Sequence, residues 1–112
     1  MHVQINKEWG HYKDIFRDSK VVFKELVVHP NEEMSYQYHN KRTEFWFVYI
    51  GTATITIDGR EFNLNEGKSI TILPYTRHRI ANRTSLPLIV FEMQCGECSE
   101  EDIVRLEDKY GR

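Results

Sequence analysis

The side chains best suited to chemistry in this sequence are an amide, two imidazoles and a carboxylate: Gln37, His39, Glu44 and His78. Gln37 and His39 alternate, so on a strand both side chains point to the same face. Glu44 follows after a short polar break, and His78 lies downstream, beyond a possible hairpin. Mixed nitrogen and oxygen donors suit a divalent first-row metal and leave room for water or substrate. The spacing therefore predicts a metal centre, which the remaining elements must position.

Length and charge limit the classes of protein that this chain can belong to. Its 112 residues predict a single domain. A formal net charge of −2 gives no reason to expect a nucleic-acid partner. No apolar run approaches the roughly 20 residues that span a bilayer, and the first residues do not resemble a signal peptide. We therefore expect no membrane partner and a cytoplasmic location.

The two cysteines, Cys95 and Cys98, form a single C-x-x-C pair. One such pair without a second is a weak zinc signal. A thioredoxin-like motif would begin a helix in a βαβ unit, and the flanking sequence does not have that pattern. We expect free thiols at the end of a strand, with redox or metal use as the alternative.

Short alternating or β-branched runs, separated by turn residues, dominate the middle of the chain. The dipeptide Asp58-Gly59 predicts a two-residue hairpin with a type I′ turn. Many short strands at regular spacing predict a sandwich or a small barrel, and a barrel of about eight strands can hold one small ligand. The runs expected to form strands cover residues 21–28, 34–39, 45–50, 52–57, 61–64, 69–73, 78–81 and 86–94.

The two ends of the chain differ from this middle part. Residues 1–20 form an arm in which Trp9 and Tyr12 are costly to leave in water, so the arm is expected to pack on the main body or on a partner subunit. Residues 99–112 begin with a possible N-cap, Ser99, followed by acidic residues. This pattern predicts a short C-terminal helix with a partly apolar side.

The spacing from Asn31 to Gly51 resembles the first cupin motif, G-x5-H-x-H-x4-E-x6-G. Asn31 replaces the first glycine, which is a mild change because asparagine tolerates left-handed backbone. Gln37 replaces the first histidine and is a neutral donor that binds metal more weakly. The resemblance implies an all-β fold, the cupin double-stranded β-helix, which is a small jelly-roll barrel.

The second cupin motif, G-x5-P-x-G-x2-H-x3-N, fits from Gly67, with His78 and Asn82 in register. The sequence departs from it at Leu73 and Tyr75, where the family has proline and glycine. Both halves of the cupin signature are thus present at the correct spacing.

A closer resemblance, to type II phosphomannose isomerases, covers almost the whole chain. In that family the cupin domain is usually the C-terminal part of a bifunctional enzyme whose N-terminal part is a mannose-1-phosphate guanylyltransferase. The resemblance implies metal ligation by the four residues named first, and substrate-facing roles for Arg42 and Arg79. The segments that carry it are residues 9–12, 37–39, 42–46, 51–53, 78–82 and 101–112.

Three positions depart from the family pattern. Asn40 and Lys41 stand in a run that is usually histidine, and Phe45 stands where the last histidine of the motif is common. Changes here have the potential to alter the substrate or remove the activity while sparing the metal.

The family's reaction interconverts mannose 6-phosphate and fructose 6-phosphate through an enediol. It needs a metal to stabilise charge on oxygen, a base to reach a carbon-bound proton, and cations to hold the phosphate. Lys41, Arg42 and Arg79 are the candidates for contacting the substrate, with Arg77 in the same pool. No carboxylate outside the metal set stands in a recognisable motif, so the base stays unassigned.

The function expected is therefore that of a metal-dependent isomerase acting on a sugar phosphate, in a homodimer. Zinc is the expected ion, with manganese, cobalt, nickel or iron as alternatives, because affinity alone favours late metals and availability decides. One alternative is a cupin that binds a sugar or another small ligand without turnover. Another is a different cupin enzyme, such as a nucleotide-sugar isomerase or an iron-dependent dioxygenase.

Overall fold

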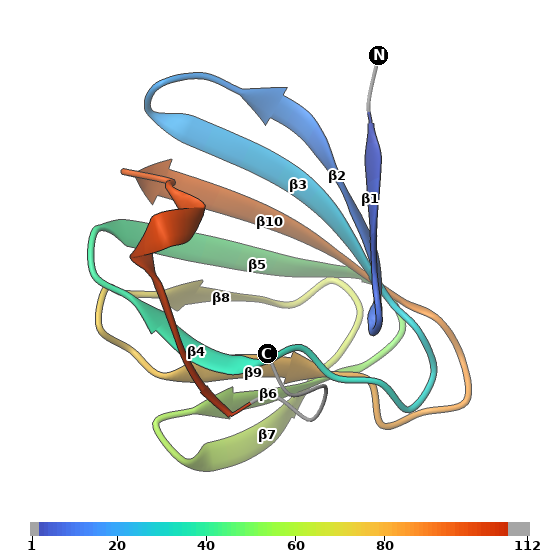
Figure 1. The fold of residues 1–112 in the computed structure, drawn as a ribbon. Coiled ribbons are helices and arrows are strands. Elements are labelled where there is room, and N and C mark those ends of the chain that lie inside the picture. The colour runs from blue at the N-terminus through green and yellow to red at the C-terminus, as the bar shows by residue number, and fades with distance from the viewer. Residues whose placement is uncertain (1–2, 108–112) are drawn as a thin grey trace.

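The computed structural model describes residues 3–107, which form two antiparallel sheets that face each other (Figure 1). One sheet has the strand order β1-β2-β3-β10-β5-β8, and the other has the order β11-β4-β9-β6-β7. The strands are β1 (Gln4–Lys7), β2 (Gly10–Arg17), β3 (Val21–Val28), β4 (Tyr36–His39), β5 (Arg42–Ile50), β6 (Ala53–Ile57), β7 (Arg60–Leu64), β8 (Ser69–Ile72), β9 (His78–Ala81), β10 (Leu88–Gly96) and β11 (Ile103–Glu107).

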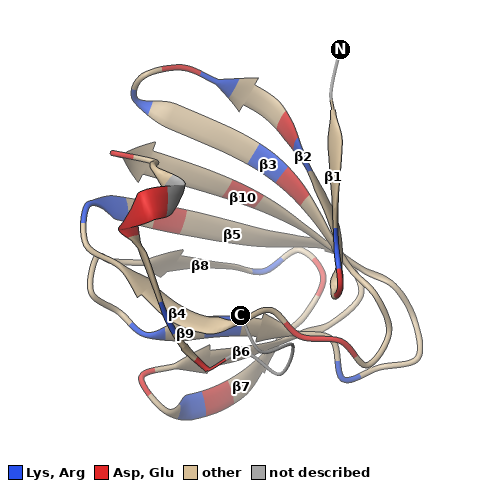
Figure 2. Cartoon of the chain, in the orientation of Figure 1, with Lys and Arg blue, Asp and Glu red and all other residues tan. Residues whose placement is uncertain are grey.

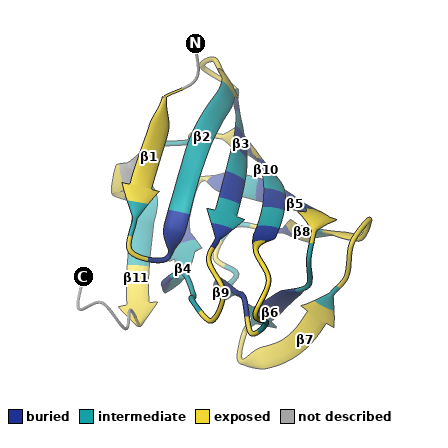
Figure 3. Ribbon diagram, turned by 90° about the vertical axis from the view of Figure 1, so that its right-hand side faces the viewer, coloured by how far each residue is buried: buried dark blue, intermediate teal, exposed yellow. Residues whose placement is uncertain are grey.

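The architecture is the all-β double-sheet fold that the sequence predicts. Strand β10 lies between β3 and β5 and pairs antiparallel with both. Along β3, alternate residues are buried, so one side of the strand faces the second sheet (Figure 3). Within residues 3–107 no helix is long and apolar enough to cross a membrane.

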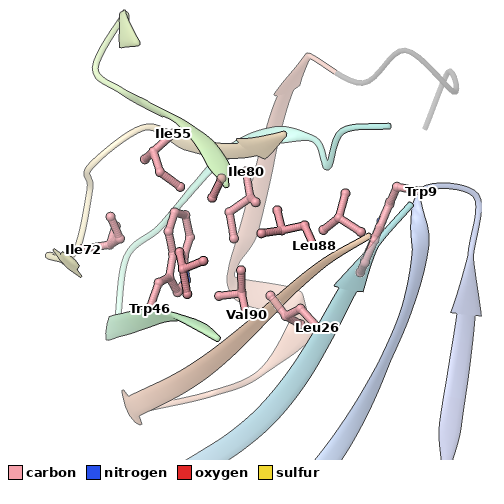
Figure 4. Close-up of a cluster of buried hydrophobic side chains, with 11 residues drawn as sticks. Trp9, Leu26, Trp46, Ile55, Ile72, Ile80, Leu88 and Val90 are labelled. Carbon is pink, nitrogen blue, oxygen red and sulfur yellow. The ribbon is translucent and has the colours of Figure 1, made fainter. Parts of the chain in front are cut away.

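The core lies between the two sheets and is built from both. Trp46 and Val90 come from the larger sheet, while Ile55 and Ile80 come from the smaller one (Figure 4). All four side chains are at most 2% exposed. Burying one such side chain contributes about 1.5–3 kcal/mol, so this layer is a major source of stability.

Within residues 3–107, three residues other than glycine adopt positive φ, and each stands at a turn that the sequence marks. Asp58 and the following Gly59 have φ of 46° and 84°, which confirms the type I′ turn between β6 and β7. Asn31 has φ of 61°, the left-handed conformation of the glycine that it replaces in the cupin motif. Tyr75 has φ of 66° where that motif has glycine, so this departure stores backbone strain.

The N-terminal arm packs on the main body, which is the first of the two alternatives expected for it. Strands β1 and β2 form a hairpin, and β2 continues the large sheet by pairing with β3. Trp9, in the hairpin turn, is 3% exposed and joins the core (Figure 4).

The predicted C-terminal helix is wrong for the residues that the structure describes. A single 3-10 turn covers Glu100–Asp102, and β11 follows it and pairs with β4. The Asp102 carboxylate accepts hydrogen bonds from the backbone amides of Asn40 and Lys41, which fixes the turn against the β4–β5 connection. The edge of β4 offers hydrogen bonds along its whole length, and β-branched Ile103 and Val104 suit a strand. The remainder of the predicted helix, residues 108–112, lies outside the described residues.

Gly10 begins β2 with φ of 151°, and a Cβ added there would overlap with the backbone carbonyl oxygen of Val27. We predict that Gly10→Ala lowers the free energy of unfolding by at least ~3 kcal/mol, because backbone atoms cannot yield without separating β2 from β3. Gly67→Ala is the matched control: Gly67 also has positive φ, but nothing lies within 4 Å of an added Cβ. The control should cost only ~1–2 kcal/mol. Urea unfolding measures both values, and equal losses would contradict the explanation.

Candidate metal centre

Three of the predicted ligands meet between the two sheets. His39 ends β4 and His78 begins β9 in the smaller sheet, while Glu44 lies near the start of β5 in the larger one. One ligand atom from each lies within 4.8 Å of the others, and each side chain is 2% exposed. The tertiary structure therefore brings together residues that are up to 39 positions apart in the chain.

His78 has a free nitrogen aimed into this cluster. Its Nδ1 lies 2.8 Å from the backbone carbonyl oxygen of Thr76, so Nδ1 carries the proton and donates it. Nε2 is then unprotonated, and it is buried without a hydrogen-bond partner in the described structure. It lies 3.7 Å from Oε1 of Glu44. A buried acceptor without a partner costs about 1–3 kcal/mol, and coordination of a cation would offset that cost.

His39 is held in the neutral state that ligation requires. Burial lowers the pKa of its imidazole to about 2, with further lowering by the positive charge of Arg42 and by His78. Its ring stacks on that of His78, with centroids 5.0 Å apart. Burial also lowers the pKa of His78. Both imidazoles are thus neutral at physiological pH, the form in which histidine binds metals.

Arg42 fills the space beside two of these ligands. Its Nη2 donates to Nε2 of His39 at 2.7 Å, and its Nε donates to Oε2 of Glu44 at 2.9 Å. The guanidinium is buried and supplies the positive charge that a buried carboxylate needs. A metal ion coordinated by Nε2 of His39 would have to displace the Arg42 side chain from that nitrogen.

Glu44 is the residue on which the cluster converges. Complete burial, and then the neighbouring Glu92 carboxylate, raise the pKa of its carboxyl group well above the ordinary value, against a lowering effect from Arg42. The indole Nε1 of Trp46 donates to Oε1 of Glu44 at 3.2 Å. The carboxyl group is therefore held in place by two donors from its own strand.

Gln37 lies at the edge of the cluster. Its Oε1 accepts a hydrogen bond from the Ser35 hydroxyl at 2.7 Å, and its Nε2 lies 3.4 Å from Nε2 of His39. Two neutral imidazoles, one carboxylate and a nearby amide are a donor set that suits a divalent first-row metal. The residues therefore fit a metal ion, with Gln37 as the outermost candidate ligand.

A cavity of about 70 Å³ opens beside the cluster, between the two sheets and under both chain ends. Arg42 and Gln37 form the part of its wall nearest the histidines. Strands β3 and β10 contribute further polar side chains to the wall, and the β1–β2 hairpin and β11 contribute residues as well. The lining residues that carry polar side chains are Lys7, Tyr12, Lys24, Ser35, Gln37, Arg42, Glu92, Gln94 and Arg105.

Two of the cations expected to contact the substrate, Arg79 and Lys41, do not line this cavity. The Arg79 guanidinium pairs with Glu33 at 3.0 Å and with Glu107 at 3.2 Å, and it is not part of the cavity wall. Lys41 has a side chain that is 59% exposed and pairs with Glu97 at 3.7 Å. Of the three predicted substrate-contacting residues, only Arg42 lines the cavity.

The departures from the family pattern lie outside the cavity wall. Phe45 is 42% exposed and points to the outer face of the large sheet, opposite to its neighbours Glu44 and Trp46. Asn40 and Lys41 form the β4–β5 connection, where their backbone amides bind Asp102. None of the three lines the cavity.

Sequence reasoning missed the cavity residues on β3 and β10, namely Lys24, Glu92 and Gln94. Their inward direction could have been inferred from the alternation of side chains along the two strands. Lys24 has the same parity as Val22 and Leu26, and Glu92 the same parity as Val90, so each shares a face with core residues. A polar side chain at an inward position of such a strand marks a polar interior. Figure 2 shows the charged positions within β3 and β10.

Comparison with known proteins places the chain in a sequence family. The family described as "Mannose-6-phosphate isomerase C-terminal" matches residues 1–108. The mannose-1-phosphate guanylyltransferase ManC of Salmonella typhimurium is 39% identical over 113 residues, covering 100% of this chain but 24% of that protein. The chain thus spans about a quarter of the length of this relative.

Solved structures show the same fold. The capsular polysaccharide assembling protein CapF of Staphylococcus aureus superposes with a TM-score of 0.85 at 13% identity, covering 96% of this chain and 35% of CapF. A Klebsiella pneumoniae protein with a double-stranded β-helix domain superposes with a TM-score of 0.77 at 18% identity, covering 94% of this chain and 80% of that one. The fold is therefore the cupin double-stranded β-helix, as the motif spacing predicts.

The neutral histidines predict how stability depends on pH in metal-free protein. The pKa of His39 is about 2 in the folded state against an ordinary value of 6.5, so the unfolded chain binds a proton that the folded chain rejects. Stability should fall by about 1.4 kcal/mol per pH unit for this residue as the pH drops below 6.5. The raised pKa of Glu44 has the opposite effect on stability. The folded chain holds this proton more tightly than the unfolded chain, so the free energy of unfolding decreases as the pH rises above about 4.5.

We predict that between pH 6.5 and pH 5 the free energy of unfolding falls less steeply in His39→Gln than in wild type. The two slopes should differ by about 1.4 kcal/mol per pH unit, which is the effect of one proton. Urea unfolding at several pH values measures the slope in metal-free protein. His29→Gln, at an exposed histidine outside the cluster, is the control and should keep the wild-type slope. Equal slopes in wild type and His39→Gln would show that His39 is not held neutral.

Proposed function

This chain belongs to the mannose-6-phosphate isomerase C-terminal family, and on that premise we propose that it is a metal-dependent sugar-phosphate isomerase. The proposed reaction interconverts mannose 6-phosphate and fructose 6-phosphate through an enediol. The observation that carries this proposal is the buried set of His39, Glu44 and His78 beside a cavity lined by cations. A sugar phosphate is an anion with many hydroxyl groups. Cationic side chains in the cavity suit the phosphate, and the other polar side chains suit the hydroxyl groups.

The metal ion would be held by His39, Glu44 and His78, with Gln37 as a further donor. Zinc is the proposed ion, and manganese, cobalt, nickel and iron suit the same donors. When bound, such an ion supplies positive charge that stabilises negative charge developing on the substrate's oxygens. The chain's own residues must then bind the phosphate, orient the sugar and move its protons.

Four cations line the cavity and form the pool for the phosphate: Lys7, Lys24, Arg42 and Arg105. Lys7 comes from the N-terminal hairpin and Arg105 from the C-terminal strand, so both chain ends would close on the ligand. The ammonium of Lys24 lies 4.4 Å above the ring of Tyr12, which fixes it at the wall. We assign the phosphate contacts to this pool in place of Arg79 and Lys41, whose charges are paired outside the cavity.

Two cavity residues have buried polar atoms without partners in the described structure: Nη1 of Arg42 is a donor and Oε1 of Gln94 is an acceptor. A ligand that satisfies both must offer acceptors and donors together. Sugar hydroxyl groups do so, because each can accept and donate a hydrogen bond. These two atoms support a polyhydroxylated ligand.

A second candidate function is a cupin that binds a sugar phosphate without turning it over. The observation that favours it is the Arg42 guanidinium, which already occupies Nε2 of His39 and Oε2 of Glu44. If this cation permanently replaces a metal, the site keeps its charge balance and loses the Lewis acid. The other cupin enzymes considered from the sequence have no specific contact in their favour.

Two further features bear on the location of the protein. Cys95 and Cys98 are unpaired, which fits a reducing compartment. The proposed substrate is a phosphorylated sugar. We therefore propose the cytoplasm as the compartment in which this protein acts.

We predict that metal-stripped protein regains turnover of mannose 6-phosphate when it is refilled with zinc or another divalent ion. A coupled assay for fructose 6-phosphate measures turnover, and calorimetry measures metal affinity. The double variant His39→Ala/His78→Ala should lose both, with turnover down by at least about a thousandfold, because two of three ligands are gone. His11→Ala/His29→Ala is the control, since that pair lies outside the cluster with ring centroids 6.3 Å apart.

Metal binding without turnover, for every ion tested, would reject the isomerase. Sugar-phosphate binding in that same sample would then favour the non-catalytic alternative. Failure to bind any metal would reject both the ion and the role assigned to the two histidines.

A further inference from the structure

Strand β10 carries a carboxylate into the cavity. Glu92 is 5% exposed and forms part of the cavity wall together with Arg42 and Gln37. Of the carboxylates within residues 3–107, Glu92 alone lines this cavity, and it is not a member of the three-residue ligand cluster. The cavity thus contains a single acidic side chain that the metal centre leaves unused.

Both oxygens of Glu92 are held by hydrogen-bond donors. Nε1 of Trp46 donates to Oε2 at 3.0 Å, and Nε2 of Gln94 donates to Oε1 at 2.5 Å. The same indole N–H also reaches Oε1 of Glu44 at 3.2 Å, so one donor links Glu92 to the ligand cluster. Glu92 is therefore fixed at the boundary between the metal centre and the space where a substrate would lie.

We propose that Glu92 is the general base of the isomerisation, an assignment that rests on the proposed function. A substrate whose oxygens face the His39–Glu44–His78 cluster would place its first two carbons against this carboxylate. The other carboxylates near the site are engaged elsewhere. Glu44 faces the ligand cluster, and Glu33 pairs with Arg79 and Arg83 away from the cavity wall.

Glu92 would move protons at C2 and then at C1 of the sugar. An oxygen of Glu92 takes the proton from C2 of the aldose, and the electron pair of the C–H bond becomes the C1–C2 double bond. The C1 carbonyl becomes a hydroxyl group by gaining a proton from solvent, which gives the enediol. The proton on Glu92 exchanges with solvent, and Glu92 then delivers a proton to C1, while the C2 hydroxyl releases a proton to solvent and becomes the ketose carbonyl. Nothing is oxidised or reduced overall, and the carboxylate is regenerated.

The test is Glu92→Gln in the refilled protein, because this change removes the base but keeps an oxygen that can accept from Trp46. Turnover of mannose 6-phosphate should fall by about 10²–10⁴ fold. Metal affinity should stay within about threefold of wild type, which a merely structural role would not predict. In D₂O, the wild type should incorporate deuterium at C1 of fructose 6-phosphate, and the variant should lose this exchange to the same degree as turnover. Glu25→Gln, on the outer face of β3, is the matched control and should exchange as wild type does.

Each outcome decides the assignment. Loss of exchange with retained metal affinity supports it. Exchange at the wild-type rate in Glu92→Gln overturns Glu92 as the base and leaves the isomerase function standing. A wild-type protein that binds metal but neither exchanges nor turns over the sugar phosphate overturns the proposed function, and the base assignment with it.

A second, independent observation concerns the outer face of the large sheet. Antiparallel sheets with one solvated face usually show polar residues on that face. Here the outward positions of β5 and β10 are largely apolar, and β5 carries charge only at its start (Figure 2). We define the outer aromatic face by its residues, which are Phe16, Phe23, Phe45, Phe47, Tyr49, Phe91 and Met93.

The outer aromatic face is continuous across four neighbouring strands. The rings of Phe23 and Phe91 stack with centroids 5.8 Å apart, and Tyr49 lies 5.3 Å from Phe91 on the other side. Phe45 and Tyr49 are 42% and 53% exposed. At about 200 Å² for each large side chain, the face exposes on the order of 500 Å² of apolar surface. A standard interface buries about 800 Å² on each partner, so this face plus a polar rim is large enough for one.

We infer that a second copy of this chain covers the outer aromatic face, in a homodimer with the two large sheets back to back. None of the seven residues of the outer aromatic face is charged, and the neighbouring charges of Lys13 and Glu25 are paired with each other at 4.0 Å. A second copy presents an identical apolar surface. A two-fold axis pairs such a surface with itself. Both cavities then stay open, because they lie on the inner side of each sheet.

Sedimentation equilibrium of the full chain tests the homodimer. The wild type should be dimeric at micromolar concentration, and Phe45→Lys should raise the dissociation constant at least about a hundredfold, because it buries a charge at the interface. Phe62→Lys is the matched control, since Phe62 is 39% exposed on β7 in the smaller sheet, and it should stay dimeric. A monomeric wild type, or a Phe45→Lys protein that remains dimeric, overturns the inference.

Discussion

The arrangement of the site depends on one buried carboxylate, that of Glu44, whose negative charge must be balanced by its neighbours. Glu44 lies between two sheets, where an isolated charge would cost several kcal/mol. Arg42 supplies the balancing charge at 2.9 Å, and Trp46 donates a hydrogen bond from two residues further along the same strand. The two histidines approach the same carboxyl group from the other sheet. Each of these side chains therefore depends on the position of Glu44, and the metal centre, the cavity wall and the core meet there.

The space between the two sheets has two parts, an apolar core and a polar cavity. Around Leu88 and Ile80, the space between the sheets is filled by apolar side chains and is a conventional core (Figure 4). Further along the same strands, inward positions become charged or amide-bearing, as at Glu92 and Gln94. Since side chains alternate, the outward positions of that second part are where the sheet places its aromatic residues. The same strands thus contribute apolar side chains to the core at one end and polar side chains to the cavity at the other.

The two ends of the chain complete the cavity. The β1–β2 hairpin adds Lys7 and Tyr12 to its wall, and β11 adds Ile103 and Arg105. Strand β11 is held at its start by the Asp102 carboxylate, which binds the connection that leads from His39 into β5. The segment that borders the cavity is therefore tied to the segment that carries the candidate metal ligands. A ligand that bridges Arg105 and Arg42 would draw on both.

The sequence by itself determined the fold class, the three residues that cluster as candidate metal ligands, and several turns, because these follow from local rules. Motif spacing fixes which residues of neighbouring strands can meet, and the positive φ of Asn31 and Asp58 follows from residue type. The tertiary structure alone decided which cations face the cavity and which carboxylate stands beside the metal centre. Arg79 and Glu92 look equally available in the sequence, but Arg79 pairs with Glu33 outside the cavity, whereas Glu92 lines it. It also decided that residues 103–107 form a strand, because the open edge of β4 offers hydrogen bonds that no local signal in the tail reveals. Long-range pairing sets the direction in which a side chain points, and that information is absent from composition and spacing.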